Sequence, residues 1–439
     1  MTDDASFTGK QFQEAGGTQD WRVLAAGASA WFNAPSHTAG AELARRVVEL
    51  TADRGLVADV DLRNRGLLVR VGAPYSPHLT TADLDAVRAI SGAARDLGLV
   101  PDPTGLQTVQ LTIDAVDRSS VIPFWRTALG YELVGDADLV DPLRRDASIW
   151  FQQQGDPRPL RNRLHVDVAR LPSLGREVVE TVEAIGGRPR QVSDYYATLA
   201  DADGNEVDIV PLVPHDDLGD VPETADWRAL FGGMTFYPTA SPVQAAELAS
   251  IVAATADEVG LPILVDLRPD GVTIDTGKDQ WEDERFATLA GRIQTAARGM
   301  GLTADPARLR FVQIGIDAVD VPAVREFWRV VLGYSNDPRE GVRDIFDPRW
   351  LNMPIIFQQM PASEEDRRAQ RNRIHVDVYL PDDQAQARID AAIAAGGRIV
   401  YDDEAPEWWT IADPEGNEVD IAVTVGREEI WLATQGGAT

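Results

Sequence analysis

The sequence predicts an α+β protein built as a tandem duplication of one long unit. Two observations support this prediction: long motifs occur twice in the same order, and each copy alternates short strand-like runs with amphipathic helical runs. Each copy is expected to contain a β-α-β-β-α segment followed by two β-α-β-β-β units. Each copy of the duplicated sequence therefore itself contains a repeated β-α-β-β-β unit.

The duplication is visible in four motifs that return in the second copy with few changes. The pairs are QLTIDAVD (110–117) and QIGIDAVD (313–320), FWRTALGY (124–131) and FWRVVLGY (327–334), RNRLHVDV (161–168) and RNRIHVDV (371–378), and DADGNEVDI (201–209) and DPEGNEVDI (413–421). The separation is 203 residues for Gln110 and Gln313, and 210 for His165 and His375. Few insertions therefore separate the copies, and each copy is about half of the chain.

The earlier segment of the first copy opens with a strand at 28–32. Ser36 then caps an amphipathic helix that ends at Gly55, because serine accepts the first free backbone N–H groups and glycine permits the left-handed terminal residue. Two alternating runs follow around a turn at 64–66, and Thr81 opens a second helix. The second copy repeats this order from 234 to about 300.

The later segment of the first copy begins with a strand at 108–116, a helix that ends at Gly130, and a strand at 148–154. Its second half begins with the strand RLHVDVA and a helix that ends at 186–187. It closes with a hairpin whose polar turn is Asp203-Gly204-Asn205. The second copy shows the same pattern.

Composition excludes several classes of function. The chain has 439 residues with 41 Lys and Arg against 70 Asp and Glu, so its net charge is −29 and it repels nucleic acid. It contains no cysteine, which excludes disulfides, thiolate metal sites and a cysteine nucleophile. Any metal must therefore be held by histidine, carboxylate or amide oxygen. The residue balance otherwise matches an acidic globular protein.

The N-terminus carries acidic residues where a signal peptide needs basic ones, and no run reaches the roughly 18 apolar residues of a membrane span. We therefore expect a cytoplasmic protein without a membrane partner. A homodimer is compatible with the sequence.

The later segments resemble the vicinal oxygen chelate superfamily, which includes the glyoxalase, fosfomycin-resistance and bleomycin-binding proteins, and specifically its glyoxalase-like branch. The resemblance is carried by FWR-x-x-LGY, NR-[LI]-HVDV and D-x-x-GNEVDI, each present in both copies. It implies glyoxalase-like domains at 104–216 and 306–425.

The earlier segments resemble pterin-4a-carbinolamine dehydratase, through Trp21 and Trp227 and through the β-α-β-β-α order. This resemblance implies degenerate dehydratase-like domains at 19–103 and 217–305. A flexible tail at 1–18 and a C-terminal tail at 426–439 would remain.

The dehydratase resemblance predicts no dehydratase activity. That family carries paired histidines at the start of the strand after the first helix, whereas this chain has no histidine at 56–59 or at 261–264. Aliphatic side chains cannot move a proton at neutral pH. A pterin carbinolamine should therefore dehydrate at the uncatalysed rate in the presence of the protein, and faster turnover would contradict this prediction. We expect both segments to act as scaffold, dimerisation or pocket-wall modules.

The chelate resemblance implies a pocket inside each domain, with ligands for one divalent metal. The implied metal ligands are Gln110, His165 and Glu206 in the first copy, and Gln313, His375 and Glu418 in the second. The same histidines and glutamates would be the catalytic residues that move a proton. The alternative is that the histidines only line a pocket and that the glutamates are solvated turn residues, with no cofactor.

The fourth ligand position falls on strands that carry glutamine in place of the family's glutamate. Strand alternation places Trp150 and Gln152 on one face, and we expect Gln152 and Gln358 to face the pocket. Aromatic pairs at 195–196 and 408–409 follow in the last hairpins, with Tyr196 and Trp409 as expected ligand-binding residues. Because these walls differ between the copies, we expect either that one pocket is specialised for the ligand or that each pocket is built for one end of it.

Three functions fit these residues. The first is an enzyme of specialised metabolism, of the lyase, isomerase, cyclase or dioxygenase type, acting on a small oxygenated substrate. The second is a non-catalytic protein that binds a drug or metabolite, as bleomycin-resistance proteins do. The third is a scaffold with degenerate pockets. A small molecule is the expected partner in the first two.

Overall fold

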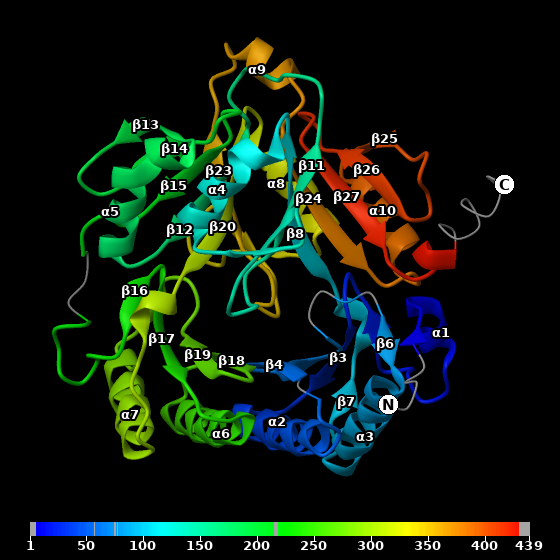
Figure 1. The fold of residues 1–439 in the computed structure, drawn as a ribbon, viewed down its shortest axis with the longest axis vertical. Helices are drawn as coiled ribbons and strands as arrows, with labels where there is room; N and C mark the ends of the chain where they lie inside the picture. The colour runs from blue at the N-terminus through cyan, green and yellow to red at the C-terminus, as the bar shows by residue number, and fades with distance from the viewer. Residues whose placement is uncertain (1–5, 57, 74–75, 77, 215–217, 430–439) are drawn as a thin grey trace.

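The computed structural model describes residues 6–429 except 57, 74–75, 77 and 215–217. Its strands form two eight-stranded sheets, one nine-stranded sheet and one two-stranded pair. In Figure 1 the nine-stranded sheet lies below the two eight-stranded sheets, and helices α2, α3, α6 and α7 run beneath it. The predicted α+β class is confirmed.

The two earlier segments each follow the predicted β-α-β-β-α order. In the first copy the elements are β3 (Ala28–Asn33), α2 (His37–Ala52), β4 (Ala58–Arg63), β5 (Gly66–Val71) and α3 (Thr81–Asp96). In the second copy they are β17 (Gly232–Pro238), α6 (Pro242–Val259), β18 (Leu264–Arg268), β19 (Gly271–Asp275) and α7 (Phe286–Gly299).

These two segments join into one sheet rather than two separate domains. Strands β4 and β18 pair antiparallel, with Asp61 opposite Asp266 at the junction. Ser36 and Ser241 cap α2 and α6 as their sequence predicts, each accepting a hydrogen bond from a backbone N–H of the first turn. The apolar faces of the helices cover one face of the sheet, which leaves the other face toward the two eight-stranded sheets (Figure 1).

The later segments each contain two β-α-β-β-β units, as predicted. The first copy contains β8 (Thr108–Ala115), α4 (Arg118–Leu129), β9 (Glu132–Val134), β10 (Asp138–Val140), β11 (Ile149–Gln153), β12 (Leu164–Ala169), α5 (Pro172–Thr181), β13 (Arg188–Val192), β14 (Ala197–Ala200) and β15 (Glu206–Ile209). The second copy contains β20 (Phe311–Ala318), α8 (Val321–Val331), β21 (Ser335–Asn336), β22 (Ile345–Phe346), β23 (Ile355–Gln359), α9 (Glu365–Ala369), β24 (Ile374–Leu380), α10 (Ala385–Ala394), β25 (Arg398–Tyr401), β26 (Trp408–Ala412) and β27 (Glu418–Val423).

The pairing of these units differs from the expected one. The domains expected at 104–216 and 306–425 would each pair their own two units, but β8 pairs with β24 and β12 pairs with β20. Each eight-stranded sheet therefore takes one half from each copy. We refer to them as the β8 sheet and the β20 sheet. The repeated motifs are nearly identical in both copies, so the sequence pattern alone could not show which copy supplies the partner strand.

The RNR part of the repeated motif holds the exchanged halves together. Arg163 is 1% exposed and donates to Asn417 and to backbone carbonyls of 367, 368, 370 and 416. Arg373 makes the reciprocal set, with donation to Asn205 Oδ1 at 2.9 Å. Asn162 and Asn372 each accept from the backbone N–H of the other copy's arginine at 2.9 Å. The motif thus encodes contacts between the copies.

Tryptophans at equivalent positions in the two copies anchor the cores of both sheets. Trp125 and Trp328, predicted to be core residues, are both 0% exposed. Each indole N–H donates to an aspartate of the last hairpin, Trp125 to Asp201 at 2.8 Å and Trp328 to Asp413 at 3.0 Å. These hydrogen bonds tie the helices α4 and α8 to the hairpins of their own copies.

The first residues of the chain are more ordered than the flexible tail predicted at 1–18. Residues 6–7 form β1 (Ser6–Phe7), which pairs with β6 (Leu79–Thr80), and 9–14 form α1 (Gly9–Glu14). Thr8 and Gln11 make a complete capping box, which satisfies two N–H groups of the first turn. The expected domain boundary at 216–217 and positions 1–5 and 430–439 of the two tails lie outside the described residues.

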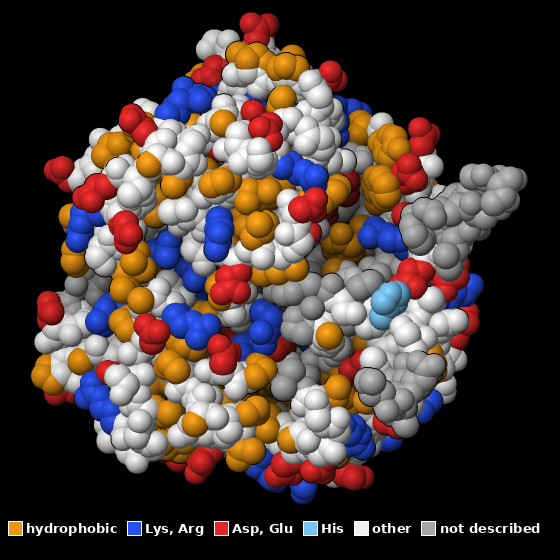
Figure 2. Space-filling view, viewed as in Figure 1, with side chains coloured by type: hydrophobic (Ala, Val, Ile, Leu, Met, Phe, Trp, Pro, Cys, Tyr) orange, Lys and Arg blue, Asp and Glu red, His pale blue; other side chains and the backbone are white. Residues whose placement is uncertain are grey.

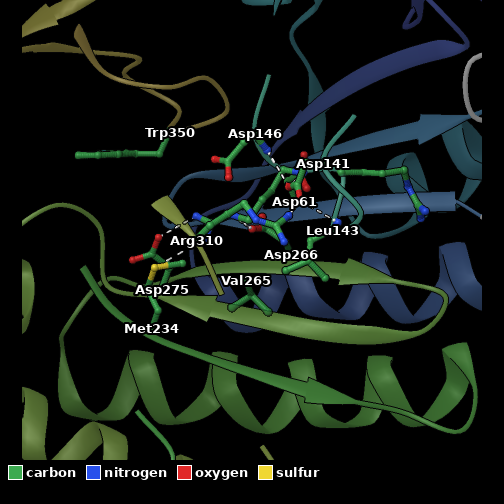
Figure 3. A network of polar contacts seen from close by, with 12 residues as sticks. Asp61, Asp141, Leu143, Asp146, Met234, Val265, Asp266, Asp275, Arg310 and Trp350 are labelled. Carbon is green, nitrogen blue, oxygen red and sulfur yellow. Dashed lines mark hydrogen bonds and ion pairs between the residues drawn. The ribbon is translucent and has the colours of Figure 1, made fainter. Parts of the chain in front are cut away.

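A network of buried arginine–aspartate pairs lies where the three sheets meet (Figure 3). Arg63 contacts Asp266 at 2.8 Å, and its counterpart Arg268 contacts Asp61 at 2.7 Å. Arg310 pairs with Asp141 in the same region. These arginines favour the ionised carboxylate of Asp61 and lower its pKa well below the ordinary value, although burial opposes this effect.

Asp146 lies at the edge of the network without an ion-pair partner in the described chain. Its backbone N–H donates to Asp141, whereas its buried Oδ2 has no hydrogen-bond partner and its carboxylate carries no dashed line in Figure 3. Burial raises the pKa of Asp146 to about 7, and the Asp141 carboxylate adds to this rise. Its ordinary pKa is about 3.9.

This environment predicts how stability depends on pH. Because the folded pKa of Asp146 exceeds the unfolded one, the folded chain binds this proton more tightly, and the resulting stability is lost as the pH rises from about 4 to about 7. An asparagine side chain at this position would mimic the neutral acid. The gain in unfolding free energy of Asp146→Asn should therefore be larger at pH 8 than at pH 5 in urea titrations, and an equal gain at both would contradict the assignment.

Acidic and basic side chains are interspersed over the face drawn in Figure 2, which shows no continuous basic surface there. None of the helices in the described ranges is long and apolar enough to cross a membrane.

Candidate functional site

Two groups of titratable side chains face away from the helices of the eight-stranded sheets. The first, which we call the β24 cluster, consists of His375, Asp377 and Asp420. The second, the β12 cluster, consists of His165, Asp167 and Asp208. In each, one ligand atom per residue lies within 4.8 Å of the others. The histidine and first aspartate are two residues apart on one strand, and the neighbouring parallel strand supplies the second aspartate.

In the β24 cluster, His375 Nε2 lies 3.5 Å from Asp377 Oδ1 and 3.7 Å from Asp420 Oδ2. His375 and Asp377 are both 6% exposed, and Asp420 is half-buried. Thr112 of β8 donates to Asp377 Oδ2 at 2.7 Å and fixes the orientation of that carboxylate. The first copy therefore helps to position this cluster of the second copy, through Thr112.

In the β12 cluster, His165 is 3% exposed and its Nε2 lies 3.4 Å from Asp167 Oδ1. Gly315 of β20 makes room for the ring, since a Cβ at this position would lie 2.2 Å from His165 Cε1. Gln313 donates to Asp167 Oδ2 at 2.7 Å. His165 is thus slightly less exposed than His375.

Several polar atoms of both clusters are buried without a hydrogen-bond partner in the described chain. They include both ring nitrogens of His165 and one oxygen each of Asp167, Asp208, Asp377 and Asp420. Burial raises the pKa of Asp377 to about 7, and it also raises the pKa values of Asp208 and Asp420. Such atoms are costly unless a partner satisfies them.

A divalent cation fits these residues. One imidazole and two carboxylates form a donor set suited to borderline and hard divalent ions, and a cation would offset the cost of keeping two close carboxylates ionised. His165 and His375, predicted from sequence, both lie in these clusters. The aspartates were missed.

The two predicted glutamates do not join the clusters. Glu206 pairs with Arg161 at 2.6 Å and Glu418 with Arg371 at 2.8 Å. The carboxylates near the histidines belong to Asp208 and Asp420, two residues further along the same strands. Because side chains alternate along a strand, these aspartates lie on the same face as the predicted glutamates.

The predicted glutamine ligands lie beside the clusters, not within them. Gln110 is paired in register with Asp377, but its amide donates to Ser148 Oγ at 3.0 Å and accepts from the Tyr379 hydroxyl at 3.2 Å. Gln313 is held by Asp167 and by Lys278 Nζ, which donates to its Oε1 at 2.9 Å. Ligand sets drawn from one copy also do not assemble, because Gln110 lies in the β8 sheet with His375 and not with His165.

Trp150 and Gln152 lie on one face of strand β11, and neither lines the cavity described below. They pair in register with Thr112 and Asp114 of β8, so Trp150 shares the face of the β24 cluster. Gln358 pairs with Asp317 and is exposed.

The aromatic pairs at 195–196 and 408–409 are not aligned as pairs, because the two strands are shifted by one residue relative to that expectation. Strand pairing aligns Ala197 with Trp409, since both face the last strand at Ile209 and Ile421. Trp409, predicted to bind ligand, packs instead against the hydrophobic core. Trp408 takes the place of Tyr196 and stacks on Tyr401 with ring centroids 6.3 Å apart.

A cavity of about 430 Å³ lies between the β8 sheet and strands β3, β4 and β5 of the nine-stranded sheet. Its wall includes Gln110 and Tyr379, which adjoin the β24 cluster, and Asp138 of β10. The earlier segment contributes Asp59 and Arg70. Burial raises the pKa of Tyr379 to about 12, with a contribution from the Asp377 carboxylate, so the hydroxyl remains a hydrogen-bond donor at neutral pH.

Sequence comparison identifies the later segments. Residues 110–210 and 313–422 match the model of the glyoxalase-like domain family. The chain thus contains two glyoxalase-like regions, as their motifs predicted. No curated protein matches the chain in sequence.

Among solved structures, the chain is similar to a point mutant of glyoxalase I from Zea mays, with TM-score 0.38 and 10% identity over 72% of this chain and 95% of that one. The similarity to the crystal structure of glyoxalase I from Zea mays has a TM-score of 0.36 and 10% sequence identity, and it covers 72% of this chain and 93% of that one. The similarity to the cppA protein from Streptococcus pneumoniae TIGR4 has a TM-score of 0.30 and 10% sequence identity, and it covers 72% of this chain and 97% of that one.

Proposed function

We propose that this protein is a metal-dependent enzyme of the vicinal oxygen chelate type that acts on a small oxygenated molecule beside the β24 cluster. The observation that carries the proposal is that one buried carboxylate oxygen each of Asp377 and Asp420, beside His375, accepts no hydrogen bond in the described chain. These residues lie on the sheet that also forms the wall of a 430 Å³ cavity. The two earlier segments act as scaffold and cavity wall, without dehydratase chemistry.

His375, Asp377 and Asp420 would hold a divalent cation in this site. When bound, such an ion supplies a Lewis acid that stabilises negative charge developing on a substrate oxygen. Thr112 keeps Asp377 oriented, and the Arg371–Glu418 ion pair lies at the edge of the cluster. Tyr379 and Gln110, whose side chains are hydrogen-bonded to each other, both line the cavity and present oxygen atoms to a molecule bound there.

Metal titration tests this function. Chelator-treated protein should bind two Mn²⁺ ions per chain in calorimetric titration, one at each cluster, because both offer the same donor set. His375→Ala and His165→Ala should each remove one ion, and the double variant should remove both. Glu418→Gln is the matched control that should keep both ions, since Glu418 is paired with Arg371.

Failure of Mn²⁺ to bind at millimolar concentration would contradict the proposal. A molecule that copurifies with the metal-loaded protein and stays unchanged would favour the sequestering class over an enzyme.

A further inference from the structure

The second copy has counterparts of the residues that line the cavity, and comparing the two sets indicates what the cavity is built to hold. Gly72 and Gly277 follow equivalent strands and both have positive φ, at 122° and 83°. The next residue is Ala73 in the first copy and Lys278 in the second. Leu139 pairs with Ile149 in the first copy, and Ile345 pairs with the equivalent Ile355 in the second. Asp138 and Asp344 each precede these residues by one position, so they are counterparts.

In the second copy, Lys278 fills the space. Its ammonium donates to Gln313 Oε1 at 2.9 Å and forms an ion pair with Asp344. The ammonium also lies 5.7 Å from the centre of the Phe231 ring, which packs on Phe311 at 5.3 Å. A carboxylate, an amide oxygen and an aromatic ring thus surround one tethered primary ammonium.

In the first copy, the same carboxylate and amide are present without that ammonium. Gln110 takes the place of Gln313, and its Oε1 accepts a hydrogen bond from the Tyr379 hydroxyl instead of from an ammonium. The side chain of Asp138 has no hydrogen-bond or ion-pair partner in the described chain. The residues that fill the second copy are small here, with Ala73 for Lys278, Ala25 for Phe231 and Thr108 for Phe311. All three small residues line the 430 Å³ cavity, together with Asp138 and Gln110.

We propose that the cavity binds a small molecule that carries a protonated amine, with its ammonium between Asp138 and Gln110 where Lys278 lies in the second copy. The counterpart space, closed by Lys278, Phe231 and Phe311, binds no such ligand. This inference rests on the proposed function in one respect: the molecule would be the substrate of the β24 cluster.

The charges of the wall favour a cation. The guanidiniums of the wall already contact carboxylates, with Arg70 on Asp61 at 2.6 Å, Arg144 on Asp59 at 2.6 Å and Arg145 on Asp275 at 2.8 Å. Arg427 lies 3.6 Å from Glu407.

Two carboxylates of the wall remain without an ion-pair partner in the described residues. Asp138 is one, and Asp146, whose buried Oδ2 accepts no hydrogen bond, is the other. Burial raises the pKa values of both, so each carboxylate is held in the cavity at a cost that a bound cation would reduce. The remaining wall includes Leu24, Leu68 and Leu106, which suit an aliphatic body attached to the amine.

A built-in ammonium tests the proposal without knowledge of the natural ligand. Ala73→Lys should reproduce the Lys278 contact in the first copy and raise the melting temperature. Asp138→Asn should remove most of this gain, so the two substitutions should be coupled in a double-mutant cycle. Asp136→Asn is the control, because Asp136 is 89% exposed and should not couple. Absence of coupling between Ala73→Lys and Asp138→Asn would overturn the proposal.

A free probe provides the second test. n-Hexylammonium should bind the metal-free full-length protein in calorimetric titration, whereas 1-hexanol and hexanoate should bind at least about tenfold more weakly, since a charge-assisted hydrogen bond is worth about one such factor. Asp138→Asn should weaken the binding of n-hexylammonium by a similar factor, and Ala73→Lys should abolish this binding. Equal binding of hexanoate, or binding that survives Ala73→Lys, would overturn the inference.

These results are separable from the metal titration. Two bound Mn²⁺ ions without amine binding would overturn only this inference. Amine binding without Mn²⁺ would overturn only the metal-dependent function.

Discussion

Replacing both Arg163 and Arg373 with alanine should destabilise the protein by more than any other pair of substitutions discussed for this chain. Both side chains are buried, and each donates several hydrogen bonds to the opposite copy. Their loss would leave buried carbonyl oxygens without donors, at a cost of about 1–3 kcal/mol for each such group. We expect each single variant to lose at least about 3 kcal/mol of unfolding free energy in urea titrations.

Arg161 is the matched control for this experiment. It belongs to the same RNR motif, but its side chain is 46% exposed and donates a hydrogen bond to Glu206 of its own copy. Arg161→Ala removes one hydrogen bond to a carboxylate of the same copy, whereas Arg163→Ala removes several to the opposite copy, so Arg161→Ala should cost clearly less. If Arg161→Ala and Arg163→Ala cost the same, the motif does not hold the exchanged halves together.

The second large effect is expected at the junction of the two earlier segments. Asp266 is 1% exposed and lies 2.8 Å from Arg63 and 3.3 Å from Arg145. Asp266→Ala would leave buried guanidiniums short of a counter-charge, and breaking a buried pair in this way costs about 3–5 kcal/mol. Chemical denaturation at pH 7 measures the loss. Asp270→Ala, at the 52% exposed partner of Arg308, should cost less than about 1 kcal/mol.

Local sequence patterns were sufficient to predict the elements of this fold. Alternating runs and capping residues such as Ser36 and Ser241 define strands and helices within a few residues, and the duplication follows from repeated motifs. The partner of each sheet half could not be predicted, because the RNR motif is the same in both copies and only the structure shows that Arg163 reaches Asn417.

The candidate site was predicted in part. His165 and His375 recur in a strand motif, which identified them. Asp208 and Asp420 were missed because the glutamates two residues earlier lie on the same face. The HVD sequence was the available signal, since it places Asp167 and Asp377 beside their histidines. The pairing of Lys278 with Asp344 joins residues 66 positions apart from different segments, and no local pattern predicts it.

An anomalous difference map from crystals grown with Mn²⁺ tests the central claim most directly. The account predicts two peaks per chain, one in contact with His375, Asp377 and Asp420 and the other with His165, Asp167 and Asp208. Peaks at Glu206 and Glu418 instead, or no peak at either cluster, would contradict it.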